Sequence, residues 1–264
     1  MDRPLAEEAA SILGAARARI EEWLEEGVEL DPTELRTRPR AEPATPTRPA
    51  PGTEPPARAG QIALLGGFDF GDPPTLERVR EVLGECTRCG LAGGRSKIVF
   101  GDGNPHADLL FVGEGPGEQE DLQGLPFVGR AGELLTRMLE RGLGISRRDV
   151  YICNLVKCRP PGNRTPLPVE VSACRPFLDG QIAAVAPKVI VALGKPATSL
   201  LLGRDVAITR VRGTWHDYRG IPVMPTFHPA FVLRQYTEEN RRLVWQDLKA
   251  ALARARGGDA EPGP

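Results

Sequence analysis

The sequence predicts an α/β fold in which helices cover both faces of a parallel sheet. Between about residues 75 and 256, short apolar runs alternate with amphipathic segments of helical period. The runs are apolar at nearly every position, which is typical of strands buried on both faces. The expected strands are 107–114, 149–158, 188–194 and 220–227.

The expected helices fill the intervals between these strands. Thr75 is predicted to cap a helix that begins at the next residue, because its hydroxyl can accept a hydrogen bond from the first helical turn. The segment 131–144 ends at a glycine, a frequent helix terminator. Further helices are expected at 169–186, 195–203 and 240–255.

Composition divides the chain into four parts. Residues 1–30 hold an amphipathic helix rich in Ala, Leu, Glu and Arg. Residues 31–74 form a proline-rich linker, expected to be extended and disordered. The globular domain spans 75–256, and 257–264 is a disordered tail.

Several classes of protein are excluded. No uncharged apolar run approaches the roughly 18 residues of a membrane helix, and the acidic start lacks the pattern of a signal peptide. Collagen, coiled coils and small disulfide scaffolds do not fit either. We therefore expect a soluble, cytoplasmic protein.

The charge is unevenly distributed. Residues 1–84 carry 16 acidic and 10 basic residues, whereas 85–256 carry 17 acidic and 24 basic ones. A basic body behind an acidic leader indicates a polyanionic partner or, equally, a solvated surface of mixed charge.

Five cysteines offer candidate metal ligands. Cys86 and Cys89 form a C-x-x-C, and Cys158 and Cys174 each begin a Cys-Arg-Pro triplet. Four thiolates suffice for structural zinc or for an iron–sulfur cluster, and spacing does not choose between them. An accidental C-x-x-C among inert thiols is the alternative. Cys153 lies inside an expected strand and is predicted to be a core thiol.

The segment 113–121, GEGPGEQED, resembles a phosphate loop only superficially. The dinucleotide fingerprint needs a glycine where Glu118 stands, and no Gly-Lys-Ser/Thr follows as in a Walker loop. Glu118 and Asp121 are explained by an acidic helix start. Glu114 directly ends a strand, where its carboxylate could position a water or stabilise a developing cation.

Polar or aromatic residues lie near the ends of other strands, where open α/β sheets bind ligands. Asn154 offers a carboxamide that can donate and accept together, which suits the edge of a base. His228 follows the fourth strand, whereas His106 and His216 are expected to be structural or superficial. Phe127 could supply a stacking face or simply pack in the core.

Two further residues suit contact with DNA. Arg234 could hold a phosphate, and Leu233 or Phe231 could wedge into a base stack.

Together these residues resemble the family 4 uracil-DNA glycosylases, which carry an iron–sulfur cluster. The matching pieces are ECTRCG, GEGPGEQED, LPFVGRAGELL, YICNLVKCRPPGNRTPLP, ACRPFL and FHPAFVLR, in the family's order. They cover residues 86–234 closely and 76–255 more loosely.

The resemblance implies a three-layer α/β/α sandwich around a four-stranded parallel sheet. It implies that Phe127 stacks on uracil, that Asn154 recognises its polar edge, and that Glu114 and Gly115 line the pocket beside the anomeric carbon. His228 would lie near the uracil O2. A mainly structural [4Fe-4S] cluster would be bound by the four cysteines Cys86, Cys89, Cys158 and Cys174.

The implied reaction is excision of a flipped uracil from DNA, which leaves an abasic site for base excision repair. His228 and backbone amides would stabilise negative charge on O2, and Glu114, or Glu120 through a water, would stabilise the sugar cation or orient the attacking water. No lysine is an obvious Schiff-base nucleophile, so no strand cleavage is expected. The segment after Cys158 lacks the histidine of a related branch that traps abasic sites covalently, so trapping is not expected.

Two other functions compete with this one: a non-catalytic iron–sulfur DNA-binding module, and a zinc-stapled nucleotide hydrolase, disfavoured by the missing phosphate loop. The first 75 residues lie outside the resemblance. Within them, residues 61–64 with Phe68 faintly resemble a sliding-clamp peptide, which makes a clamp or another repair protein a possible partner of the N-terminal region. A monomer is expected.

Overall fold

The computed structural model of this chain describes residues 67–258. The predicted N-terminal helix, the clamp-like segment 61–64, nearly all of the linker and most of the tail lie outside the described residues. Among the described residues, no helix is long and apolar enough to cross a bilayer.

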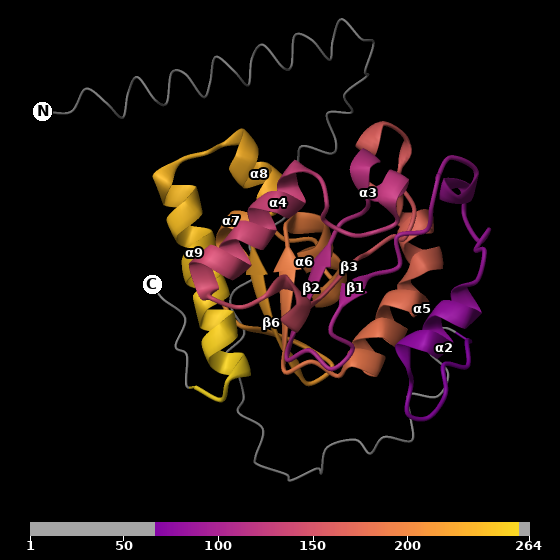
Figure 1. Cartoon of the computed structure of the whole chain (residues 1–264), viewed down its shortest axis with the longest axis horizontal. Helices are drawn as coiled ribbons and strands as arrows, with labels where there is room; N and C mark the ends of the chain where they lie inside the picture. The colour runs from indigo at the N-terminus through magenta and orange to yellow at the C-terminus, as the bar shows by residue number, and fades with distance from the viewer. Residues whose placement is uncertain (1–66, 259–264) are drawn as a thin grey trace, which may run out of the picture. The chain divides into compact units, whose positions relative to one another are not determined.

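One mixed sheet forms the middle of the described region (Figure 1). Its strand order is β1-β3-β2-β4-β6-β5, and the four inner strands are parallel. The two edge strands pair antiparallel to their neighbours. The strands are β1 (Asp102–Gly103), β2 (Leu109–Gly113), β3 (Tyr151–Asn154), β4 (Val189–Leu193), β5 (His216–Tyr218) and β6 (Ile221–Thr226).

The register of the parallel strands aligns their carboxyl ends. Gly113 at the end of β2 pairs with Asn154 at the end of β3, and Leu193 of β4 pairs with Thr226 of β6. The residues that follow these four strands therefore meet at one edge of the sheet, where ligands bind in open α/β folds.

Helices cover both faces of the sheet, so the molecule has the three layers that the resemblance implies (Figure 1). The longer helices that follow the sheet strands or pack beside them are α2 (Leu76–Leu83), α4 (Arg130–Arg137), α5 (Pro168–Val185), α6 (Lys195–Leu202) and α9 (Glu238–Ala255). The short helices and turns are η1 (Gly90–Gly93), α3 (Glu118–Gln123), the π-helical η2 (Met138–Leu143), η3 (Arg147–Asp149), η4 (Pro161–Asn163), α7 (Ile208–Val211) and α8 (Pro229–Arg234).

Alternating side chains of the inner strands supply two separate apolar cores. Phe111 of β2 and Val191 of β4 face α4, α8 and α9. Their neighbours Leu110 and Ile190 face α5 and α6 on the other side. Because both faces of each inner strand are buried, nearly every strand residue is apolar, which is why the continuous apolar runs predicted the strands correctly.

The sequence missed the two edge strands. β1 spans two residues and β5 three, and both contain exposed or half-buried polar positions that give no apolar run. The sheet has six strands rather than only the four parallel ones expected. Strand 149–158 also proved too long, because the chain leaves the sheet after Asn154. The cap of α2 was correct: the Thr75 hydroxyl accepts a hydrogen bond from the Arg78 amide at 3.2 Å.

Candidate active site

A cleft of about 500 Å³ lies at the carboxyl edge of the inner strands. It is lined by residues from the segments after β2, β3, β4 and β6. Eight of the residues singled out in the sequence line it: Glu114, Gly115, Glu120, Phe127, Asn154, His228, Phe231 and Arg234. The topology thus brings together side chains that lie up to 120 positions apart in the sequence.

Asn154 ends β3 and is 1% exposed. Its side-chain oxygen Oδ1 is buried without a hydrogen-bond partner. Buried polar atoms are nearly always satisfied, so an orphaned acceptor in a cleft indicates a ligand that donates to it.

The Phe127 ring lies beside His228, with ring centroids 5.6 Å apart and a tilt of 31°. The ring is buried and belongs to the core that faces α4, and it also lines the cleft. Gly113 makes room for it: a Cβ at that position would lie 2.6 Å from the Phe127 Cζ and would overlap the Asn154 Oδ1. Only glycine at the end of β2 lets these two side chains share the floor of the cleft.

Phe127 has a φ of 53°, in the left-handed region that non-glycine residues rarely adopt. The Glu120 carboxylate holds this conformation, because its Oε1 accepts hydrogen bonds from the amides of Val128 and Gly129, both at 2.8 Å. On the other side, the Arg147 guanidinium donates to the Pro126 carbonyl at 2.5 Å. The strain at Phe127 is thus supported by side chains from outside its own loop.

His228 caps α8 through its ring. The Nδ1 atom accepts a hydrogen bond from the Ala230 amide at 3.1 Å. Burial, and secondarily the Arg234 charge, lower the pKa of His228 to about 4. The imidazole is therefore neutral at pH 7, and since Nδ1 is an acceptor, the proton resides on Nε2.

Glu114 follows β2 directly and is half-buried in the cleft. Burial raises the pKa of its carboxyl, while a hydrogen bond with the Thr165 side chain acts in the opposite direction. The neighbouring Gly115 packs closely on the next segment: a Cβ there would lie 3.0 Å from the Val156 Cγ2. That packing keeps the β2–α3 loop close to the end of β3.

The rim of the cleft is basic. Arg234 at the end of α8 is exposed and lines the cleft together with Arg164 and Lys195. Leu233 is only partly exposed and packs on the core that faces α9. Tyr236, two residues beyond Arg234, is 59% exposed.

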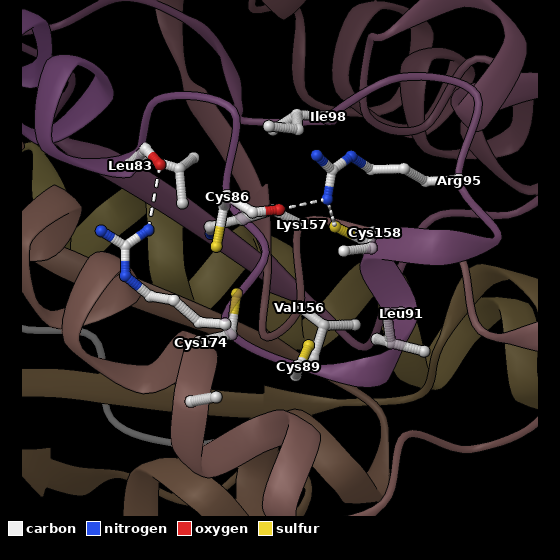
Figure 2. Close-up of a pocket in the computed structure, with 13 residues that line it drawn as sticks. Leu83, Cys86, Cys89, Leu91, Arg95, Ile98, Val156, Lys157, Cys158 and Cys174 are labelled. Atoms are coloured by element: carbon white, nitrogen blue, oxygen red, sulfur yellow. Dashed lines mark hydrogen bonds between the residues drawn. The ribbon is translucent and has the colours of Figure 1, made fainter.

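A second site gathers four of the five cysteines. Cys86, Cys89, Cys158 and Cys174, here called the cysteine cage, line one pocket between α2, η1 and α5 (Figure 2). Arg95 closes it by donating to the Cys86 carbonyl at 2.6 Å and to the Cys158 Sγ at 3.5 Å. Cys153 lies outside this pocket in the sheet core and is fully buried, as expected of a core thiol.

The donor set of the cage suits a metal centre. Burial raises the pKa of the Cys158 thiol and raises that of Cys174 to about 11. Such thiols ionise when a cation binds them, and this is how metal ions and clusters are held by cysteine. No group of three or more His, Cys, Asp or Glu side chains among residues 67–258 is spaced to hold a metal ion. The four thiols in one pocket nevertheless fit a larger cofactor with one contact to each sulfur.

The sequence did not reveal every residue that shapes these sites. Arg147 gave no signal, and Gly113 was noticed only as part of the segment GEGPGEQED, because the requirement for each arises from contacts with distant segments. Asp121, assigned to an acidic helix start, also joins the two sites: its carboxylate accepts hydrogen bonds from the Ser96 amide at 2.9 and 3.0 Å. This links α3, beside the cleft, to the segment that follows the C-x-x-C.

Comparison with known proteins agrees with this geometry. The family model "Uracil DNA glycosylase superfamily" matches residues 100–249. A type-4 uracil-DNA glycosylase of Thermotoga maritima is 53% identical over 178 residues, covering 67% of this chain and 92% of that protein. The type-4 enzyme of Sulfurisphaera tokodaii is 44% identical over 183 residues, 66% of this chain and 82% of that protein. A type-5 uracil-DNA glycosylase of Pyrobaculum aerophilum is 36% identical over 120 residues, 44% of this chain and 50% of that protein.

The matching family model thus places the chain in the uracil DNA glycosylase superfamily. The extent and level of identity define the branch: the chain belongs to the type-4 uracil-DNA glycosylases.

Proposed function

We propose that this protein is a monofunctional uracil-DNA glycosylase that hydrolyses the N-glycosidic bond of deoxyuridine in DNA and leaves an abasic site for base excision repair. The observation that carries the proposal is the buried, unpartnered Oδ1 of Asn154 in a cleft beside an aromatic ring and a neutral histidine. Membership of the type-4 family supports the same activity.

Recognition of the base follows from these three side chains. The uracil flips out of the duplex, at a cost of a few kcal/mol, and its ring stacks on Phe127. The Asn154 Oδ1 accepts the N3–H of uracil, and its amide nitrogen donates to O4. Cytosine has an unprotonated N3 and an amino group at position 4, so it would face Asn154 with both polarities reversed.

Cleavage builds negative charge on the uracil and positive charge on the sugar. The neutral His228 carries its proton on Nε2 and donates it in a hydrogen bond to O2, which stabilises the departing anion. The Glu114 carboxylate stabilises the oxocarbenium-like sugar or orients the attacking water. Gly115 keeps the wall beside the anomeric carbon free of a side chain.

Glu120 contributes to the proposed site by holding the loop that carries Phe127. The sequence assigned it to catalysis through a water, and it does line the cleft. Its Oε1 already accepts two backbone hydrogen bonds, so its role through Phe127 is the better supported one.

The DNA strand remains intact in this reaction. Lys195 is the one lysine that lines the cleft within the described residues, and its ammonium pairs with Asp205 at 3.0 Å. Schiff-base lysines are activated by desolvation, whereas the Lys195 side chain is 54% exposed. Arg234 at the rim would bind a backbone phosphate, and Leu233 beside it would contact the bases next to the extruded one. The protein acts as a monomer in this proposal.

The cysteine cage would bind a [4Fe-4S] cluster. Cys86 and Cys89, Cys158 beyond the end of β3, and Cys174 of α5 would hold it, and the cluster would link these segments without taking part in a chemical step. Iron and acid-labile sulfide near four each per chain, with absorption near 400 nm, would support this assignment. Stoichiometric zinc without that absorption would exclude it.

The activity is tested with a labelled oligonucleotide that carries one uracil, followed by alkali and electrophoresis. Cleavage that requires alkali is the expected result, and thymine or cytosine in place of uracil should give none. Asn154→Ala should lower kcat/KM by about 100-fold, whereas Asn104→Ala, whose side chain serves only a distant turn, should match the wild type. Full activity of Asn154→Ala would show that the unpartnered Asn154 Oδ1 is not needed for excision, which would contradict the proposal.

A further inference from the structure

Lys157 is a lysine buried inside the protein. Its side chain is 1% exposed, whereas lysine is almost never fully buried without a partner. It lies between Val156 and Cys158, at the point where the chain has left β3 and enters the wall of the cysteine cage (Figure 2). The proposed reaction leaves this residue without a role.

The ammonium of Lys157 is directed back towards β3. Its Nζ donates a hydrogen bond to the Asn154 carbonyl at 2.7 Å. The other end of the same peptide unit is also fixed, because the Leu155 amide donates to the Gly113 carbonyl at 3.0 Å. The peptide that follows Asn154 is therefore held on both sides, and this fixes the backbone from which the Asn154 side chain projects.

No ion pair of the described residues includes Lys157. Its ammonium is directed at a neutral carbonyl, the Asn154 oxygen. Lys157 also lines the pocket of the cysteine cage, and its backbone amide donates a hydrogen bond to the Cys174 sulfur.

The backbone of Lys157 is held as well. Its carbonyl accepts a hydrogen bond from the Val99 amide at 2.8 Å, which ties it to the segment that follows the C-x-x-C. One residue thus contacts the cage through its main chain and the base-recognising asparagine through its side chain.

We propose that Lys157 is a positioning residue for uracil excision, which links the cysteine cage to Asn154 by fixing the Asn154 carbonyl with its buried ammonium. The inference rests on the proposed function, because it acts through the recognition of uracil by Asn154. It also gives the cage a function beyond holding the fold together: the cage sets the place of Lys157, and Lys157 sets the angle at which the Asn154 amide meets the base.

A double-mutant cycle on the cluster-loaded full chain tests this link. Lys157→Met keeps an unbranched apolar side chain and removes the donor. It is compared with Asn154→Ala, the double variant and the control Lys188→Met, whose lysine forms an exposed ion pair with Asp108. Lys157→Met should lower kcat/KM on uracil DNA by about 10- to 100-fold. The double variant should stay within about threefold of Asn154→Ala, because residues that act as a unit are not additive. Lys188→Met should match the wild type.

A second measurement separates positioning from a general structural defect. Inhibition by free uracil should weaken in Lys157→Met, while affinity for DNA with an abasic site, which presents nothing to Asn154, should remain at the wild-type value. Wild-type kcat/KM in Lys157→Met, losses that multiply in the double variant, or equal weakening of both ligands would each overturn the proposal.

Iron content and absorption near 400 nm are recorded for each variant. If Lys157→Met does not retain its cluster, Lys157→Gln is used, since its side chain is too short for the neutral amide to reach the Asn154 carbonyl. The losses must again be non-additive, and losses that multiply would again overturn the link.

The cycle also separates the two proposals. An inactive wild type, or an Asn154→Ala variant with full activity, would remove the proposed function, whereas loss in Asn154→Ala alone would remove only the role of Lys157.

Discussion

The cysteine cage and the active-site cleft are formed by adjoining segments of the chain, and they differ in the residues that line them. The cage is lined mainly by apolar side chains, among them Leu83, Leu91, Ile98 and Val156 (Figure 2), together with Arg88, Arg95 and Lys157. The cleft is open and lined by Glu114, Asn154, His228 and basic side chains. In the cage, burial raises the pKa of the Cys158 and Cys174 thiols. In the cleft, burial keeps the His228 imidazole neutral, so that its Nδ1 accepts the Ala230 amide while Nε2 carries the proton. Desolvation therefore acts in both sites. It favours neutral thiols where a cation would bind, and a neutral imidazole where negative charge would develop on uracil.

The largest expected difference is between substitution of a cysteine in the cage and substitution of the core cysteine. Cys174→Ala should abolish cluster binding and lower the free energy of unfolding by roughly 3 kcal/mol or more, because a shared cross-link is lost. Cys153→Ala, at a fully buried position outside the cage, should retain its iron and lose only about 1 kcal/mol. Iron analysis and thermal unfolding measure both. Equal iron loss in the two variants would mean that the cage is assigned wrongly.

The next effect should appear in the cleft alone. Gly113→Ala places a methyl group against the Phe127 ring and the Asn154 amide, so kcat/KM should fall by about 100-fold while the iron content stays constant. Gly93→Ala is the matched control, since a Cβ there meets nothing within 4 Å. Steady-state kinetics on uracil DNA measure this effect. A Gly113→Ala variant with wild-type kcat/KM would contradict the packing described for the cleft floor.

A smaller effect is expected from the support of the Phe127 loop. Glu120→Ala leaves the amides of Val128 and Gly129 without their acceptor, which should cost about 1–3 kcal/mol of stability. The freed loop should lower kcat/KM by roughly 10-fold. Glu118→Ala, which removes only a long ion pair of an exposed carboxylate with Arg159, should change neither quantity. Denaturant titrations and kinetics of the two variants, side by side, decide the matter.

The smallest effect concerns pH. Since burial lowers the pKa of His228 to about 4, the imidazole does not titrate between pH 5 and 8, and kcat/KM should show no transition near pH 6.5. The acid limb belongs to Glu114, whose raised pKa makes activity fall as pH decreases towards it; this limb should disappear in Glu114→Gln, at a lower overall rate. For stability, the unfolded state binds a proton at His228 below about pH 6.5 and the folded state only near pH 4, so stability decreases as pH falls through that interval. A pH–rate profile with a histidine-like transition near 6.5 would contradict this assignment.

Much of the architecture could be predicted from local pattern. Strands buried on both faces give uninterrupted apolar runs, so β2, β3, β4 and β6 were found from the sequence. The edge strands were missed because two or three half-exposed residues carry no periodic signal. The prediction that residues after parallel strands meet at one edge of the sheet was confirmed for Glu114, Asn154 and His228.

Other site features depended on contacts that no local pattern encodes. Leu233 stays a predicted DNA contact, and the structure adds that it packs partly on the core, near the exposed Tyr236. The sequence suggested a catalytic carboxylate at Glu120, and in the structure this carboxylate accepts hydrogen bonds from two backbone amides. Which oxygen of which acid is free for chemistry depends on loop conformation, and loop conformation depends on neighbours far along the chain.

The sequence by itself determined the alternation of strands and helices, the proline-rich segment before the domain, and the residue types available for chemistry. Those features follow from local periodicity and composition, which act within a few residues. The tertiary structure alone decided that Arg95 closes the pocket of the four cysteines and that Asn154 keeps an unpartnered oxygen. It alone placed the Lys157 ammonium on the Asn154 carbonyl. Each of these depends on strand register and on where the chain leaves the sheet, which are set by the packing of distant segments rather than by the preference of any one of them.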